Sequence, residues 1–203
     1  MITRTQPIFD SVQIHTALAA GAEASFFTTA LNQQANQLTT ATDTPYKKTD
    51  YHTNIKNNQT EKGQELFVKG FEIYSDEVDI NLLAQLFFDS KAYFQFYKGD
   101  DKLFQENLAK MVKLKNPVAL AIGDGQASAK AQKLGFIFPG DEGYKLDYGI
   151  VIPEQTNYKA LIKFTNAVTF KKLTFDYGTL AANAAYTSPF NLFVKLVVEE
   201  TKK

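Results

Sequence analysis

The last part of the chain carries an apolar residue at every second position. These residues are Phe190, Leu192, Val194, Leu196 and Val198. Successive side chains of a β-strand point to opposite faces, so this spacing places all five on one face of a strand. The sequence therefore predicts a long C-terminal strand, and any fold assigned to the chain has to include a sheet around it.

Shorter segments with the same period precede this strand, and turn signals such as Gly99-Asp100-Asp101 and Pro139-Gly140 separate them. In the first segment, Phe67, Phe71 and Ile73 share one parity. The predicted strands cover residues 65–74, 91–97, 118–122, 134–138, 146–152, 158–164, 168–170 and 173–177, with a bulge or turn at 171–172. The 17 Phe and 10 Tyr residues agree with this reading, because aromatic side chains favour sheets.

Two segments have helical spacing instead. Leu82, Leu83, Leu86 and Phe87 predict a helix over residues 79–89, with Asp76 or Asp79 as its N-cap. A second helix is expected to bury the apolar residues Leu103, Phe104, Leu108, Met111 and Val112. Many short strands joined by turns, with no long internal repeat, predict a mainly β sandwich or barrel with two short helices.

Residues 1–44 are poor in charge, with only Arg4, Asp10, Glu23 and Asp43, or 4 of 44 positions. Alternation over 12–18 predicts a strand, and the apolar residues of 26–38 fit one face of a helix. We expect an N-terminal arm over 1–44 that packs on the main domain, 45–203, or on a neighbouring copy. The alternative is the first strand and helix of an ordinary core. Residues 39–64 are predicted to form a polar loop, with a hairpin at 46–55.

Composition excludes some classes of function. The 22 basic and 22 acidic residues give zero net charge, whereas extensive phosphate binding favours a basic excess, so no strong direct nucleic-acid binding is expected. Neutral charge also permits dense association of copies. The chain has no cysteine, which is usual for proteins made in a reducing cytoplasm. The N-terminal residues do not form a secretory signal, and no apolar run is long enough to span a membrane.

The search for catalytic, cofactor or metal residues identifies none. His15 and His52 have no other ligand at metal-site spacing and are expected in a strand and a solvated loop. The stretch 123–130 begins Gly-x-Gly but matches neither phosphate-loop nor dinucleotide spacing. The acidic groups at 76–79, 100–101 and 141–142 lack a calcium-loop pattern and are expected at turns and caps. No serine lies in Gly-x-Ser-x-Gly, so the sequence does not predict an enzyme.

One pattern resembles a known family. The run Glu65–Ile73 is followed by the predicted helix and by a strand ending at Gly99. Later, an Ile-x-Ile-Pro-x-Gln-x-Asn-aromatic stretch, Ile150–Tyr158, lies between two strands. This arrangement, over residues 65–199, resembles jelly-roll capsid proteins of tailless icosahedral bacteriophages, most of all those with an internal membrane.

The resemblance implies a jelly roll, single or compact double, in a structural subunit of a virion. Such a subunit would assemble into homotrimers or pseudo-hexameric capsomers with other virion proteins, and an internal lipid membrane is a further expected neighbour. Sixteen strands leave little room for loops in 203 residues, which puts the double form in doubt. The alternative is a non-catalytic sandwich that binds carbohydrate or a receptor, with Tyr93, Tyr97 and Tyr158 exposed to stack on sugars.

Overall fold

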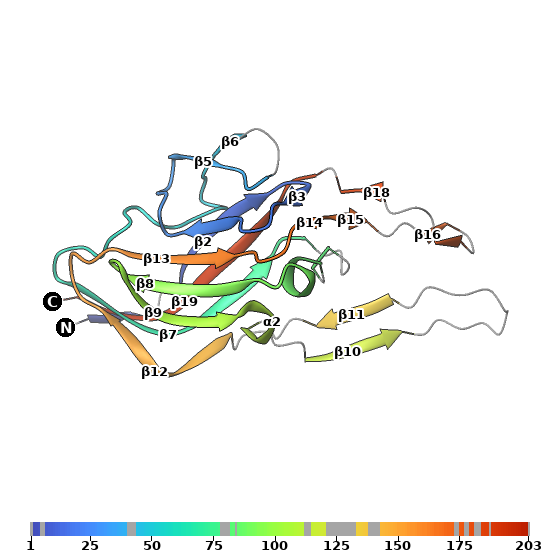
Figure 1. Ribbon diagram of the computed structural model, residues 1–203. Coiled ribbons are helices and arrows are strands. Elements are labelled where there is room, and N and C mark those ends of the chain that lie inside the picture. Colours follow the sequence, from blue (N-terminus) through green and yellow to red (C-terminus); the bar gives the residue numbers. More distant parts are fainter. Residues whose placement is uncertain are drawn as a thin grey trace.

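The computed structural model describes the chain except residues 1, 5–6, 40–43, 78–81, 84, 112–114, 121–132, 138–142, 173–174, 177–178, 181–183, 187 and 203. For residues 2–4, 115–120, 133–137, 172, 175–176, 179–180, 184–185 and 202 it describes the backbone alone. The fold is mainly β, as the sequence predicts, with antiparallel strands in two larger sheets and several short pairs (Figure 1).

The first sheet is built around the long C-terminal strand, β19 (Phe190–Lys202). β19 pairs on one side with β2 (Ile8–Ile14) and, at its far end, with β1 (Ile2–Arg4). On the other side it pairs with β7 (Gln64–Ser75), which pairs in turn with β12 (Tyr144–Ile152). The predicted C-terminal strand is therefore confirmed, and it lies inside its sheet with partners on both sides.

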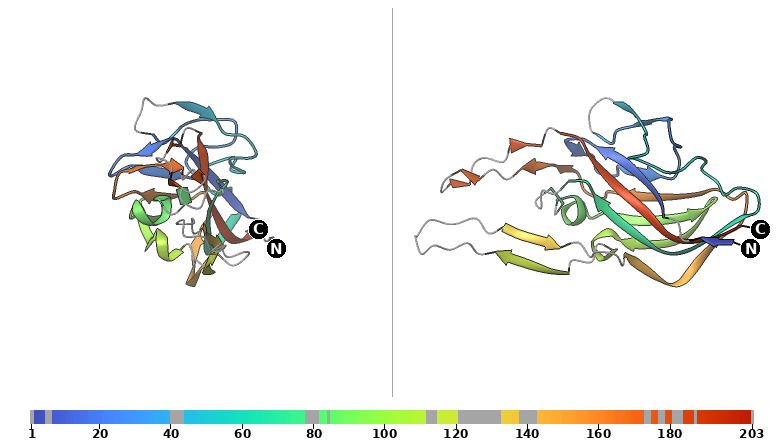
Figure 2. Two further views of the ribbon diagram at one scale, coloured as in Figure 1. Left: turned by 90° about the vertical axis from the view of Figure 1, so that its right-hand side faces the viewer. Right: turned by 180° about the vertical axis from the view of Figure 1, so that it is seen from behind.

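The second sheet has the order β4 (Glu23–Phe26), β13 (Tyr158–Lys163), β8 (Tyr93–Lys98) and β9 (Asp101–Asn107). It packs on the first sheet, as the views in Figure 2 show. The short pairs are β3 (Ala17–Leu18) with β14 (Val168–Thr169), β5 (Gln34–Asn36) with β6 (Pro45–Lys47), β10 (Lys115–Leu120) with β11 (Lys133–Ile137), β15 (Lys171–Lys172) with β18 (Ala184–Ala185), and β16 (Phe175–Asp176) with β17 (Thr179–Leu180).

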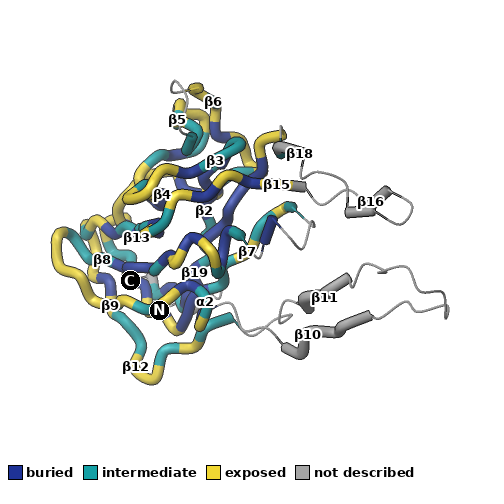
Figure 3. Tube along the Cα trace, turned by 45° about the vertical axis from the view of Figure 1, so that its right-hand side comes forward, coloured by how far each residue is buried: buried dark blue, intermediate teal, exposed yellow. Residues whose placement is uncertain are grey.

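The core lies between the two sheets, where the dark tube of Figure 3 marks buried residues. At its centre Phe71 of β7 meets three aromatic rings of the second sheet. Its ring centroid lies 4.8 Å from that of Phe94, 5.2 Å from Phe96 and 5.3 Å from Phe104. Aromatic pairs at such distances contribute roughly 0.5–1.5 kcal/mol each beyond the burial of their area.

The predicted helices are confirmed only in part. Residues 82–83 and the π-helical turn η1 (Gln85–Asp89) are helical, and Leu82, Leu83, Leu86 and Phe87 are buried as the spacing predicts. Residues 79–81 and 84 of the predicted helix lie outside the described residues. The second helix is wrong over residues 103–107, which belong to β9; of its described residues, those of α2 (Leu108–Met111) are helical, and Val112 lies outside the described residues. The tight turn at Gly99 brings β9 back onto β8. Residues 103–107, whose apolar spacing would also fit a helix, therefore pair with β8 as a strand.

No helix forms over residues 26–38, contrary to prediction. Phe27 and Asn32 have φ angles of 64° and 67°, which an α-helix does not allow, and residues 34–36 form β5. β5 pairs with β6, so Tyr46 lies opposite Ala35 and the predicted hairpin at 46–55 is also wrong. The segment before residue 44 contributes β2 to the first sheet and β4 to the second.

A β-bulge changes which face of β7 is buried. Val198 pairs with Val68, but Val197 pairs with Gly70, so Lys69 is an extra residue in the ladder. The expectation that Phe67 and Phe71 share a face is therefore wrong: Phe71 is buried and Phe67 is 37 % exposed. A Cβ on Gly70 would lie 2.4 Å from the Tyr144 carbonyl oxygen, so the close approach of β12 requires glycine there.

Replacing Phe71 by alanine should lower the free energy of unfolding by about 3–5 kcal/mol, because it empties the centre of the aromatic layer. Lys62→Ala is the control: Lys62 is exposed in the turn before β7, so its replacement should change stability by less than about 0.5 kcal/mol. Urea denaturation followed by circular dichroism measures both. Equal losses for the two variants would contradict the assignment of Phe71 to the core.

Candidate functional site

An exposed apolar surface lies along the edge strand β12 and the neighbouring β7. β12 leaves the β7 ladder between Lys145 and Ile150, and Tyr148 at this irregularity is 90 % exposed. Val151 is 46 % exposed, and Phe67 lies beside them on β7. A large aromatic residue this exposed, next to other apolar groups, is typical of an interaction surface. We call these three residues the β12 surface.

A cavity of about 380 Å³ opens beside the β12 surface. The interrupted ladder leaves this space between β12, β7 and β19. Its lining includes Phe67, Gly70, Tyr144, Leu146, Gly149 and Val197. Tyr148 is not part of the lining, although Asp147 and Gly149 on either side of it are. The surface therefore presents a projecting ring and an apolar hollow next to each other.

Two ion pairs join charged residues of β7 and β19 on the first sheet near this surface. Lys69 of β7 forms an ion pair with Glu199 of β19, and Lys195 Nζ lies 2.8 Å from the Glu72 carboxylate. Exposed pairs of this kind contribute little to stability, about 0–1 kcal/mol each. Their effect is to leave this face without a strong net charge.

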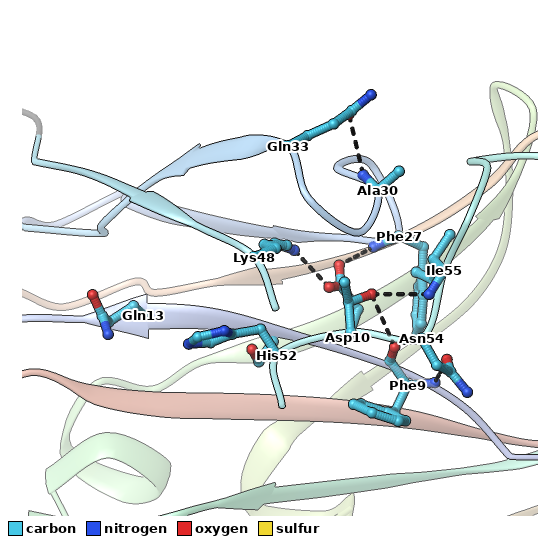
Figure 4. Close-up of polar contacts among 12 residues, drawn as sticks. Phe9, Asp10, Gln13, Phe27, Ala30, Gln33, Lys48, His52, Asn54 and Ile55 are labelled. Carbon is cyan, nitrogen blue, oxygen red and sulfur yellow. Dashed lines mark hydrogen bonds and ion pairs between the residues drawn. The ribbon is translucent and has the colours of Figure 1, made fainter. Parts of the chain in front are cut away.

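A second site is buried at the open side of the two sheets, where β2 and β4 are the edge strands. Asp10 of β2 points inward from the position opposite Val194 and is 0 % exposed. Lys48, just after β6, is 1 % exposed, and its Nζ lies 2.5 Å from Asp10 Oδ1. The backbone N–H of Phe27 donates to Asp10 Oδ2 at 2.6 Å, from a different direction (Figure 4). We call Asp10, Lys48 and the Phe27 N–H the Asp10 site.

Neighbouring groups close the Asp10 site to water. Thr53 forms an isolated bridge with Asp10. The Phe27 and Tyr158 rings pack with centroids 5.7 Å apart. Desolvation raises the pKa of Asp10 and lowers that of Lys48, and it outweighs their mutual attraction. Burial therefore favours the uncharged forms of both groups.

Two tyrosines near the Asp10 site also titrate abnormally. Burial raises the pKa of Tyr46 to about 12, and it raises that of Tyr158 to about 12 as well. The Tyr46 hydroxyl accepts from the Gln13 N–H at 3.2 Å. Tyr158 is 5 % exposed, so the expectation that it is free to stack on sugars is wrong, and Tyr93 and Tyr97 are half-buried.

The histidines and acidic groups noted in the sequence lie apart. His15 follows β2, and His52 lies in a turn where its ring packs against Tyr46 and Tyr51. The Asp76 carboxylate accepts from the Asn191 N–H at 2.7 Å and from the Tyr51 hydroxyl at 3.0 Å, which fixes the start of β19. Asp100 and Asp101 lie at the exposed β8–β9 turn.

Several sequence candidates lie outside the described residues, namely Asp79, the whole Gly123–Lys130 stretch and Asp141-Glu142. Within the part of the chain that is described, no three His, Asp or Glu side chains gather as metal ligands would. No helical segment described has the length and apolar character needed to cross a bilayer.

No protein family, curated protein or solved structure matches the chain. The role of each site therefore has to be inferred from its own geometry. Sequence reasoning noted Asp10 only as one of the few charges before residue 44 and gave Lys48 no role. The one signal available was a lone aspartate at the same parity as Ile8, Val12 and Ile14, since an acidic residue on the inward face of a strand needs a partner.

Stability should fall between pH 10 and pH 12 because of Tyr46 and Tyr158. An unfolded tyrosine ionises near pH 10, whereas these two keep their protons to about pH 12 when folded. Their contribution is therefore complete below pH 10 and is lost as pH rises, by up to about 2–3 kcal/mol for each residue. Urea denaturation across this range, with the ultraviolet absorbance of tyrosinate, measures the effect.

The control is Tyr158→Phe, which keeps the ring but removes the titrating hydroxyl. This variant should lose less stability between neutral and alkaline pH than the unmodified chain. An identical alkaline loss in both proteins would show that Tyr158 is not the titrating group.

Proposed function

We propose that the two sheets form a single jelly roll. The eight main strands in chain order are β2, β4, β7, β8, β9, β12, β13 and β19. Numbered from one to eight, they give sheet orders of 1-8-3-6 and 2-7-4-5. The first strand pairs with the eighth, the second with the seventh, the third with the sixth and the fourth with the fifth. A jelly roll has this order of pairs, because its chain forms four antiparallel strand pairs that wrap around one core.

We infer that the protein is a structural subunit of a viral shell, a bacteriophage icosahedral capsid that it builds by self-assembly into trimers or larger capsomers. The observation that carries this proposal is the β12 surface on a jelly-roll scaffold. An exposed ring, Tyr148, stands beside an apolar hollow on the same strand. A shell subunit requires exposed contact surfaces of this kind, and every copy in the shell presents the same ones.

A second copy of this chain is the occupant that fits the β12 surface best. An apolar cavity of about 150 Å³ is enough to bind benzene, and the hollow here measures about 380 Å³. It therefore accommodates a tyrosine ring such as Tyr148 from a neighbour. Because Lys69 and Lys195 are already paired with acidic side chains, two such faces approach without strong repulsion.

The purified chain should form trimers or larger particles in solution. Light scattering over a concentration series measures its mass. Tyr148→Ser should weaken the association about tenfold or more, because a large aromatic residue at the centre of an interface contributes much of its binding energy. A strict monomer at high concentration would contradict the proposed assembly and favour a binding module.

Leu103→Ser is the matched control for this experiment. Leu103 is an apolar residue on β9 of the other sheet and is 41 % exposed. Its replacement removes a comparable exposed group without touching the β12 surface. If both substitutions weakened association equally, the association would be non-specific and hydrophobic, and β12 would not be its interface.

A further inference from the structure

The segment between β4 and β7 is held along the outer edge of β2. Asn54 and Phe9 exchange hydrogen bonds: the Phe9 N–H donates to Asn54 Oδ1 at 2.9 Å, and the Asn54 N–H donates to the Phe9 carbonyl at 3.3 Å. The Thr53 hydroxyl also donates to the Phe9 carbonyl. This segment inserts Lys48 between the edges of the two sheets, so the Asp10 site is where three parts of the chain meet.

The arrangement at Asp10 is unusual for a simple ion pair. An amine and a carboxyl group are in contact, both are excluded from water, and the second carboxyl oxygen faces a backbone donor. That donor comes from Phe27, a bulky buried residue held at a φ of 64°. A bulky residue is strained in this left-handed backbone conformation, and such strain often marks a position with a chemical role.

We propose that Lys48 and Asp10 condense to form an intramolecular amide that joins β2 covalently to the segment after β6. The neutral Lys48 amine attacks Asp10 Cγ, and the new bond is Nζ–Cγ. The bond from Cγ to Oδ1 breaks, and Oδ1 leaves as water with the carboxyl proton and one amine proton. The second amine proton stays on the amide nitrogen, so atoms and charges balance without any other reactant.

The surroundings favour each part of this step. Burial raises the pKa of Asp10 and lowers that of Lys48, and both shifts favour the protonated acid and the neutral amine that this step uses. The Phe27 N–H points at Oδ2, where negative charge develops in the tetrahedral intermediate. Because Asp10 and Lys48 are buried, bulk water has little access to the amide once it has formed, and its hydrolysis is suppressed.

The amide would also remove the difficulty of keeping two ionisable groups in the core. A buried ion pair gives up hydration that its mutual attraction only partly restores. The amide keeps the hydrogen bond from Phe27, since its carbonyl oxygen is the former Oδ2. It would close the chain between residues 10 and 48, so this segment could not leave β2 without breaking a covalent bond.

The test is the intact mass of the folded, purified protein under denaturing conditions. We expect a mass lower than that of the sequence by one water molecule. Trypsin cleaves after free lysine, so the digest should lack cleavage after Lys48 and contain one branched peptide joining residues 10 and 48. A folded protein with the full sequence mass and normal cleavage after Lys48 would overturn the proposal.

Two variants exclude other sources of water loss. Lys48→Met should restore the full mass, whereas Lys47→Met, which replaces the exposed neighbouring lysine, should keep the loss. A loss that persists in Lys48→Met would place the dehydration elsewhere, for example at Asp124-Gly125, and would also overturn the proposal. The measurement on the unmodified chain decides the question even if Lys48→Met folds poorly, and it is independent of whether the chain assembles.

Discussion

Packing of aromatic rings between the two sheets is the interaction on which the rest of the structure depends. Phe71 lies against Phe94, Phe96 and Phe104, and the apolar face of β19 covers the adjoining part of the core. The sheets are joined mainly through these side chains. Since strands of the first sheet are interspersed in the chain with those of the second, burying this layer brings distant segments together.

The β12 surface is a consequence of how the first sheet bends around that core. The extra residue Lys69 in β7 and the longer irregularity in β12 occur at the same place in the sheet. There the ladder opens, Tyr148 turns outward and the cavity forms behind it. Bulges at sheet edges commonly redirect side chains in this way. The proposed assembly surface is thus produced by the irregularity that lets Phe71 face inward.

The opposite side of the first sheet presents a different physical problem. β2 and β4 are edge strands of different sheets, and an open edge exposes unpaired backbone groups. The segment from Thr49 to Ile55 covers β2, and Lys48 and Asp10 fix it there. A structural subunit that has to withstand assembly benefits from such a fixed edge, and a covalent link would make it permanent.

Much of the strand content was predictable from the sequence, because alternation is a property of neighbouring residues. The spacing of Phe190, Leu192 and Val194 identified β19, and similar spacing identified β7, β8, β12 and β13. The same local argument failed for residues 26–38 and 103–107, where apolar spacing suited a helix. There, the pairing of β4 with β13, of β5 with β6, and of β9 with β8 through the turn at Gly99 decided the conformation.

The sequence by itself determined the β class, the neutral charge and the long C-terminal strand. Only the tertiary structure decided which face of β7 is buried, because a single extra residue in a ladder reverses parity and leaves no periodic signal. It alone brought Lys48 to Asp10, 38 positions away along the chain. Contacts at that separation depend on how the sheets close around their core, which no local pattern of residues specifies.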